Sequence, residues 1–377
     1  KEKTLKGKMP SRRKFFKAVA VTGAATAATL AMPNIASAAT TLKVQAAWGG
    51  GIFLANAQDY VKRVNEMSGG KLKIDLLPVN SVVKTSQMQD AVHRGVLDGA
   101  HYVPAYWYSK AASASLFGTG PCWGWSAQEL LGWIQYGGGM QLFNELMGNL
   151  GLNLVSFFNS PMPAQPLGWF KEQIKDASQM KGLKYRTVGL AADVLGVMGM
   201  SVVQLPGGEI QPAMKSGLID AAEFNNPTSD SDFGMQDVSK HYHLASFHQS
   251  QEAFEITFNK KKFDGLAPEL QKILEYASEA ENSNFFWRNT LSYANDLVKL
   301  KNKLGVNVYR TPDSIMQAQL DAWDVIVKKF NAADPFFKKV VESQKDYAKK
   351  VMAYLLLNSP DYGMAYRHHF GEPTKAI

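Results

Sequence analysis

The sequence predicts an α/β protein built from two similar lobes. A helical pattern, a glycine and a short apolar strand occur within residues 211–226, where Gly217 ends the helix and residues 218–222 suit a buried strand. The same pattern occurs in frame over residues 89–102, with Gly95 at the position of Gly217. A unit repeated at so large a separation is typical of two related lobes, not of a solenoid of short repeats. A chain of 377 residues is also long enough to form two cores.

The ends of the two repeated strands are the first candidates for a functional site. Glu223, Phe224 and Asn225 follow the second strand, and His101 and Tyr102 end the first. Ligands of open α/β sheets bind beyond the carboxyl ends of the strands, so we expect these residues to face a cleft between the lobes. A glutamate at a strand exit, taken alone, is more often a solvated or capping residue. The repeat is what favours a ligand site.

The positive charge of the chain is concentrated at its N-terminus. The formal net charge is +8, and residues 1–38 hold eight Lys and Arg side chains against one acidic residue, Glu2. The remainder has 33 basic and 32 acidic residues and is close to neutral. This balance argues against a protein that binds nucleic acid or a membrane surface.

Residues 1–38 have the pattern of a twin-arginine export signal. Arg12 and Arg13 precede an Ala-rich run over residues 18–32, and small residues at the end of the segment supply a cleavage site. The alternative is a membrane anchor, but a spanning helix needs about 20 strongly apolar residues and this run is shorter. We expect the mature chain to begin at Ala39 and to be exported to the periplasm in soluble form.

Export by this route usually follows folding, sometimes around a cofactor. An exported cofactor-containing enzyme is therefore the alternative function. The sequence holds no catalytic pattern that supports it. Cys122 is the only cysteine, which excludes a C-x-x-C-H haem site and a thiolate cluster. The glycine runs at 49–51 and 137–139 lack the flanking residues of a phosphate-binding loop. We therefore expect a binding protein and not an enzyme.

Arg186 is the candidate for recognition of an anion. It lies at the end of a strand predicted over residues 182–187, beside Gly189, where a planar guanidinium can bind a carboxylate through two hydrogen bonds. The alternative for an isolated arginine is a surface salt bridge. The aromatic stretch at 102–125, which includes Tyr106, is predicted to pack in the core or between the lobes, and some of its rings could line a pocket.

Several long helices are predicted from apolar residues at helical spacing. They cover residues 130–150, 263–293, 315–330 and 336–357. The apolar face of the last helix is wide for a tail. It predicts either a dimer interface or packing on the helix's own lobe.

Four segments together resemble the TRAP-transporter periplasmic solute-binding proteins of the DctP type. They are residues 137–145, 164–170, 181–186 and 216–227. The resemblance covers residues 42–370 and is greatest to the branch that binds 2-oxo and 2-hydroxy monocarboxylates with a metal ion. It implies a periplasmic binding protein fold of two lobes joined by crossing strands and a long helix, with a C-terminal helical extension. It also implies a receptor that delivers a small organic acid to the membrane subunits of the transporter.

The resemblance also implies roles for individual residues. Arg186 matches the arginine that forms a salt bridge with the substrate carboxylate. The residues that match groups around the metal ion are Gln165, Glu223, Gln249 and, through its backbone carbonyl, Phe224. The other residues expected at the substrate are Gln165, Trp48, Tyr106 and Asn225. Some relatives have a glutamate at the position of Gln249, which makes the site of this chain less negative. Oxygen ligands of this kind suit Ca²⁺ or Na⁺, and such a cation would offset the repulsion between Glu223 and an anionic ligand.

The same resemblance divides the chain and implies its partners. Lobe I is expected to comprise residues 39–163 and 251–295, and lobe II residues 164–250 and 296–335. Residues 336–377 are expected to form a C-terminal helical tail through which two copies associate as a homodimer.

Overall fold

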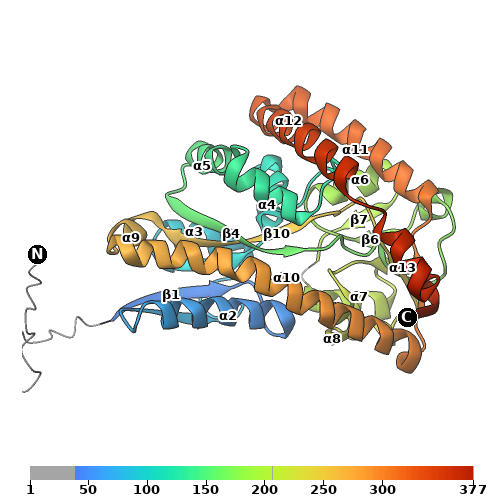
Figure 1. Cartoon of the computed structure of the whole chain (residues 1–377), viewed down its shortest axis with the longest axis horizontal. Helices are drawn as coiled ribbons and strands as arrows, with labels where there is room; N and C mark the ends of the chain where they lie inside the picture. The colour runs from blue at the N-terminus through green and yellow to red at the C-terminus, as the bar shows by residue number, and fades with distance from the viewer. Residues whose placement is uncertain (1–38, 206, 377) are drawn as a thin grey trace, which may run out of the picture. The chain divides into compact units, whose positions relative to one another are not determined.

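The structure is a computed structural model that describes residues 39–205 and 207–376. The twin-arginine signal expected over residues 1–38 lies outside these residues. The described part of the chain forms two β-sheets with helices packed around each (Figure 1). This arrangement confirms the predicted α/β fold of two lobes.

The first sheet has the strand order β2-β1-β3-β10-β4. Its strands β1, β2 and β3 are parallel, whereas β10 runs antiparallel to both β3 and β4. The bounds are β1 Thr40–Ala46, β2 Leu72–Leu77, β3 Gly99–Tyr102, β4 Leu154–Met162 and β10 Glu252–Asn259. All eight residues of β10 are buried, because the strand lies inside the sheet and between covering helices.

The second sheet has the order β11-β9-β5-β8-β6-β7. Strand β6 is parallel to β7 and β8, and β5 is antiparallel to β8 and β9. The bounds are β5 Gly168–Phe170, β6 Lys184–Arg186, β7 Ser201–Val203, β8 Ala221–Ala222, β9 His241–Leu244 and β11 Asn307–Arg310. The apolar strand predicted over residues 218–222 is therefore shorter than expected.

Helices cover both sheets. The shorter ones are α2 Gly51–Met67, α3 Met88–His93, α4 Ala127–Tyr136, α5 Gly139–Asn149, α6 Leu190–Val197, α7 Gly207–Ser216, α8 Pro227–Asp232 and α9 Lys260–Asp264. The C-terminal helices are α10 Pro268–Leu304, α11 Asp313–Ala333, α12 Pro335–Asn358, α13 Tyr362–Phe370 and α14 Pro373–Ala376. None of the helices within the described ranges combines the length and apolar character needed to cross a membrane.

Two predicted helices differ from the observed ones, for local reasons. The helix expected over residues 130–150 is two helices, because Gly138 between α4 and α5 has a φ of 91°, a left-handed conformation that glycine adopts readily. The helix expected over residues 263–293 begins later and ends later, as α10. Pro268 occupies its first turn, where proline is favoured because no hydrogen bond is lost.

Two segments and one helix connect the sheets. Strand β4 continues into β5, and the chain returns from β9 into β10. Helix α10 runs along both lobes and contacts α2 and β4 of the first and α8 of the second (Figure 1). Where β4 leaves the first sheet it carries an extra residue, since Glu252 pairs with Met162 but Phe254 pairs with Asn159. Ser160, inside this bulge, has a φ of 55°.

The first half of α12 packs on the first lobe. Phe337, Val340 and Val341 join the apolar core that also contains Trp133 of α4. The second half differs, because Leu356 and Leu357 are largely exposed. Helix α12 therefore has one part that packs on its own chain and one part that leaves apolar side chains uncovered.

Candidate functional site

Arg186 and Glu223 form a buried ion pair at the carboxyl ends of two adjacent strands. Arg186 ends β6 and is in register with Ala222 of β8, so Glu223 follows directly beside it. Arg186 Nη1 lies 3.1 Å from Glu223 Oε1 and donates a second hydrogen bond to the Glu223 carbonyl at 3.0 Å. Only 3% of the Arg186 side chain and 1% of the Glu223 side chain are exposed. The surface salt bridge considered as an alternative for Arg186 is therefore wrong.

The guanidinium of Arg186 is fixed on two sides. Its Nε donates a hydrogen bond to the Leu205 carbonyl at 2.9 Å, and its Nη1 donates to Glu223 Oε1. Within the described residues, Nη2 makes no hydrogen bond. Arg186 is thus oriented by the protein and keeps one donor group for another acceptor.

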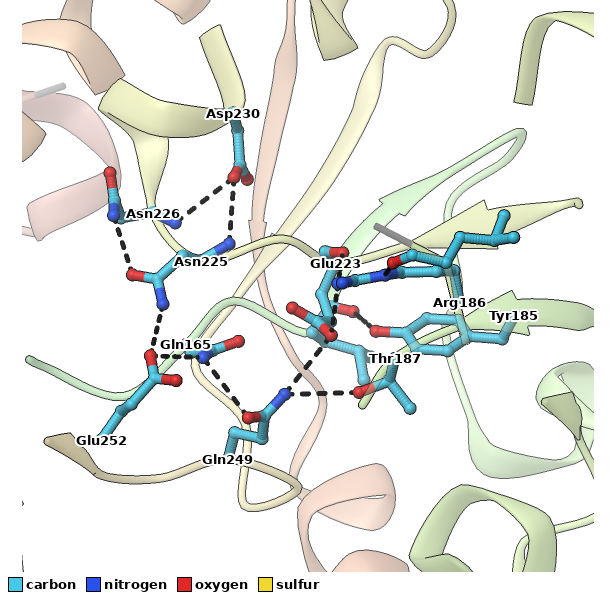
Figure 2. Close-up of polar contacts among 12 residues, drawn as sticks. Gln165, Tyr185, Arg186, Thr187, Glu223, Asn225, Asn226, Asp230, Gln249 and Glu252 are labelled. Carbon is cyan, nitrogen blue, oxygen red and sulfur yellow. Dashed lines mark hydrogen bonds and ion pairs between the residues drawn. The ribbon is translucent and has the colours of Figure 1, made fainter. Parts of the chain in front are cut away.

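Two glutamine side chains connect the ion pair to the rest of the site (Figure 2). Gln249 Nε2 donates to Glu223 Oε1 at 3.3 Å and to Thr187 Oγ1 at 3.3 Å. Gln165 Nε2 donates to Gln249 Oε1 at 3.4 Å. The backbone of the two crossing segments is paired at the same point, because Gln165 N donates to the Gln249 carbonyl at 2.9 Å.

Glu252 is a second buried carboxylate in this network, and sequence reasoning missed it. Its Oε2 accepts hydrogen bonds from Gln165 Nε2 at 2.9 Å and from Asn225 Nδ2 (Figure 2). Burial raises the pKa of Glu252 to about 8, and the hydrogen bonds from Asn225 and Gln165 oppose this rise. Burial likewise raises the pKa of Glu223 to about 7, and the positive charge of Arg186 opposes it.

Asp230 holds the segment that carries Asn225. Its Oδ1 accepts from the backbone N–H groups of Asn225 and Asn226, at 3.1 and 3.3 Å. Its Oδ2 accepts from Trp169 Nε1 and from the Tyr242 hydroxyl, both at 2.9 Å. Burial raises the pKa of Asp230, while these four hydrogen bonds favour the charged form. This carboxylate has no free acceptor position in the site and serves to hold the loop.

A small cavity of about 20 Å³ adjoins these polar groups. It is lined by Trp48, Phe53, Val103, Tyr106, Gln165, Arg186, Val188, Phe224, Asn225, Glu252 and Phe254. Trp48 stacks on Phe254 with ring centroids 4.7 Å apart, and its Nε1 donates to His101 Nδ1 at 2.8 Å. Burial lowers the pKa of His101 to about 4, so its neutral imidazole can accept this hydrogen bond.

Two buried oxygen atoms at the site fit a cation. Gln165 Oε1 and Glu223 Oε2 accept no hydrogen bond from any described residue. Buried polar atoms are almost always paired, so two unpaired oxygens in one network point to a group that bonds them. No three His, Cys, Asp or Glu side chains in the described ranges gather to form a metal site by themselves. A cation here would therefore rely on carboxylate, amide and backbone oxygens, which are the ligands of Ca²⁺ and Na⁺.

The structure brings the residues expected at the substrate and the metal ion into one place. Six of them line the cavity: Trp48, Tyr106, Gln165, Arg186, Phe224 and Asn225. Glu223 and Gln249 lie directly behind them and are linked to Arg186 and Gln165 by hydrogen bonds. The individual roles assigned to these residues remain predictions. The expectation that Tyr102 faces the cleft is wrong, because this side chain is buried in the core of the first lobe with its hydroxyl directed at Glu255.

The fold and this cavity define a protein that encloses a small polar solute between two lobes. The chain belongs to the DctP family, described as bacterial extracellular solute-binding protein, family 7, whose model matches residues 52–334.

Relatives of this chain include curated proteins and solved structures. A monocarboxylate 2-oxoacid-binding periplasmic protein of Nostoc sp. is 30% identical over 312 residues, which are 83% of this chain and 84% of the relative. A TRAP periplasmic solute-binding protein of Pseudoalteromonas atlantica, with bound sodium and pyruvate, is 27% identical with a TM-score of 0.80, over 88% of this chain and 99% of that one. One from Colwellia psychrerythraea, with bound calcium and pyruvate, is 28% identical with a TM-score of 0.79, over 88% and 100% of the two chains.

Membership of this family settles the class of function. The protein is an extracytoplasmic solute receptor that acts with the membrane partners of a TRAP transporter, as predicted. The family consists of substrate-binding proteins of transporters, so the alternative of an exported enzyme is not supported.

Proposed function

We propose that this receptor binds a small 2-oxo or 2-hydroxy monocarboxylate together with a cation beside Arg186, where the cavity of about 20 Å³, which has room for about one water molecule, widens as the lobes separate to admit them. The observation that carries the proposal is the pair of buried, unpaired oxygens, Gln165 Oε1 and Glu223 Oε2, next to a guanidinium with a free donor. An acid with a second oxygen beside its carboxylate presents two oxygens to such a cation. The relatives that bind a 2-oxo acid, two of them with sodium or calcium, support the same ligand class.

Each polar residue has a distinct task in this proposal. Arg186 offers Nη2 to the ligand carboxylate and is held in place by Leu205 and Glu223. Gln165, Glu223 and the Phe224 carbonyl hold the cation. Gln249 forms hydrogen bonds with both Gln165 and Glu223 and so fixes the separation of these two side chains. The cation supplies the positive charge that lets an anion approach Glu223.

The apolar residues of the cavity complete the proposed site. Trp48 and Tyr106 cover the ligand and exclude water, which strengthens the charge interactions beneath them.

Asn225 has an indirect role in the proposed site. Its Nδ2 donates a hydrogen bond to Glu252 and so helps to hold that carboxylate in place.

Calorimetry tests the proposed ligand and the need for a cation. Chelator-treated protein in choline chloride buffer is titrated with pyruvate or lactate, alone and with added CaCl₂ or NaCl. We expect binding only when a cation is present, and a bound ligand at 100 times its Kd should stabilise the fold by about 2.7 kcal/mol. Equal affinity without any cation would refute the cation's role. Absence of binding for all 2-oxo and 2-hydroxy acids under every condition would refute the ligand class.

We further propose that lobe I comprises residues 39–163 and 251–295 and lobe II residues 164–250 and 296–335.

We also propose that the chain is exported through the twin-arginine pathway. The supporting pattern for export is Arg12-Arg13 ahead of a weakly apolar segment. Replacing both arginines by lysine should leave the precursor in the cytoplasm of the host. Periplasmic protein from the double variant would contradict this route.

A homodimer through the C-terminal helix is the proposed assembly. Tyr354, Leu356 and Leu357 at the end of α12 are exposed, Leu357 by 88%, and Met364 and Phe370 of α13 are exposed as well. Exposed apolar side chains along the C-terminal helices favour contact with another protein surface. Light scattering should give the mass of two chains for the native protein and of one chain for Leu356→Ser/Leu357→Ser. A monomeric native protein would refute the proposal.

A further inference from the structure

Glu252 lies on the same face of β10 as Phe254, because strand side chains alternate between the two faces, and both residues line the cavity. Glu252 begins β10, and its pairing with Met162 is offset by one position from the pairing of Phe254 with Asn159. Only 3% of Glu252 is exposed, and its carboxylate lies in the wall that also contains Arg186 and Gln165.

Glu252 is an acid without a basic partner. The one ion pair among the site residues joins Arg186 to Glu223, and no Lys, Arg or His of the described chain forms an ion pair with Glu252. Its hydrogen bonds come from two neutral amides, those of Gln165 and Asn225. A buried carboxylate with only neutral donors lacks the opposite charge that normally accompanies burial.

We propose that Glu252 makes this site select a divalent cation over sodium. The inference rests on the proposed function above, in which an anionic ligand and a cation share the cavity. The charges of Arg186 and Glu223 offset each other. A cation bound beside Glu252 favours the ionised carboxylate over the protonated form that burial favours, so the ligand carboxylate and Glu252 together contribute two negative charges in a dry site. A dication neutralises both, whereas Na⁺ leaves one buried negative charge unpaired.

The contacts of Glu252 place its charge close to the proposed cation ligands. Its Oε2 shares the Gln165 Nε2 group, and the other polar atom of the same amide is the unpaired Gln165 Oε1. Gln249 then links Gln165 to Glu223. Glu252 therefore acts on the cation either as a direct ligand or through Gln165, and both arrangements attract a doubly charged ion more than a singly charged one.

The test compares the affinities for Ca²⁺ and Na⁺ in native protein and in Glu252→Gln. Chelator-treated protein in choline chloride buffer with saturating pyruvate is titrated with CaCl₂ and, separately, with NaCl in a calorimeter. We expect native protein to bind Ca²⁺ far more tightly than Na⁺. Glu252→Gln should lower the ratio of the two affinities by about tenfold to a hundredfold.

Glu255→Gln is the matched control. Glu255 lies on the same strand and is buried like Glu252, but its carboxylate accepts from Ser156 at 2.7 Å, inside the first lobe. This variant should leave both cation affinities unchanged. The double variant Gln249→Glu/Glu252→Gln returns a carboxylate to the network, beside Gln165 and Glu223, and should recover the preference for Ca²⁺.

The outcomes separate this inference from the proposed function. Equal loss of Ca²⁺ and Na⁺ affinity in Glu252→Gln would make Glu252 a positioning residue only and overturn the inference. Native protein that binds sodium as tightly as calcium would overturn it even if Glu252→Gln does not fold. Ligand binding that needs no cation at all would instead refute the cation's role in the proposed function.

Discussion

Replacing Arg186 by lysine tests how the receptor recognises its anion. Lysine keeps the positive charge but concentrates its donors on one nitrogen, whereas Arg186 reaches Leu205, the Glu223 carbonyl and Glu223 Oε1 from two separate nitrogens. A single ammonium cannot occupy these positions and also offer the donor that Nη2 provides. We therefore expect Arg186→Lys to lose the hydrogen bond to the ligand carboxylate.

The expected size of the loss follows from the hydrogen bonds involved. A hydrogen bond to a charged group contributes about 1.5–3 kcal/mol, which corresponds to roughly 10- to 150-fold in affinity. The Leu205 carbonyl, which accepts from Arg186 Nε, would also lose its donor, at about 1–3 kcal/mol of folding stability. Calorimetry with pyruvate and CaCl₂ measures the first effect, and urea denaturation monitored by circular dichroism measures the second.

Arg310→Lys is the control that shows whether the changes in ligand affinity and stability are specific to Arg186. Arg310 ends β11 in the same sheet but is exposed, so Arg310→Lys should change neither quantity. Affinity of Arg186→Lys within about threefold of the native protein, with the fold intact, would refute the role given to the Arg186 guanidinium.

Three further substitutions test the buried carboxylates. Glu223→Gln should weaken acid binding in CaCl₂, because the cation loses a charged ligand; tighter acid binding by this variant in chelator would refute the cation's role, and calorimetry in the two buffers measures both affinities. Asp230→Asn should lower the free energy of unfolding in urea by about 1–3 kcal/mol, because an amide cannot accept all four hydrogen bonds; no loss would contradict the loop-holding role. Burial raises the pKa of Glu255 to about 8, so folded Glu255 keeps a proton that the unfolded chain releases. Its contribution to stability therefore falls from pH about 4.5 to about 8, by up to about 1.4 kcal/mol per pH unit. Glu255→Gln should flatten the pH dependence of the urea midpoint accordingly, and an unchanged slope would show that Glu255 does not titrate in this range.

The predictable part of the site comes from local patterns. Arg186 and Glu223 each lie where a short strand ends, and adjacent parallel strands bring their carboxyl ends together at one edge of the sheet. The repeated helix-glycine-strand unit is apparent in the sequence, and it corresponds to α3 with β3 and to α7 with β8.

Glu252 could not be predicted in the same way. Its position at the site depends on the pairing of β10 with β3 and β4, which joins segments far apart in the sequence. Strand β10 contains two acidic residues, Glu252 and Glu255, in a mostly apolar segment. Acidic residues are rarely fully buried, so this pattern indicates carboxylates with a special role. Only the three-dimensional pairing shows that Glu252 belongs to the site and Glu255 to the core of the first lobe.

The long helices were predicted better than their ends. Apolar periodicity identifies α11 and α12 because it is sustained over many turns. It does not report the left-handed Gly138 that separates α4 from α5, because the spacing of apolar residues carries no information on the backbone conformation of a glycine between them.

The two crossing segments carry more than the connection between the lobes. Gln165 and Gln249 lie on them and are joined backbone to backbone, and Glu252 follows a few residues later. Rotation of one lobe against the other displaces groups near the crossing segments least, whereas Trp48 and Phe53 follow β1 of the first lobe and would move with that lobe relative to Arg186 and Glu223 of the second. Opening would therefore withdraw the aromatic cover while the amides of the crossing segments keep their spacing. In a receptor arranged in this way, release of the solute depends on admitting water to an assembled site, not on taking that site apart.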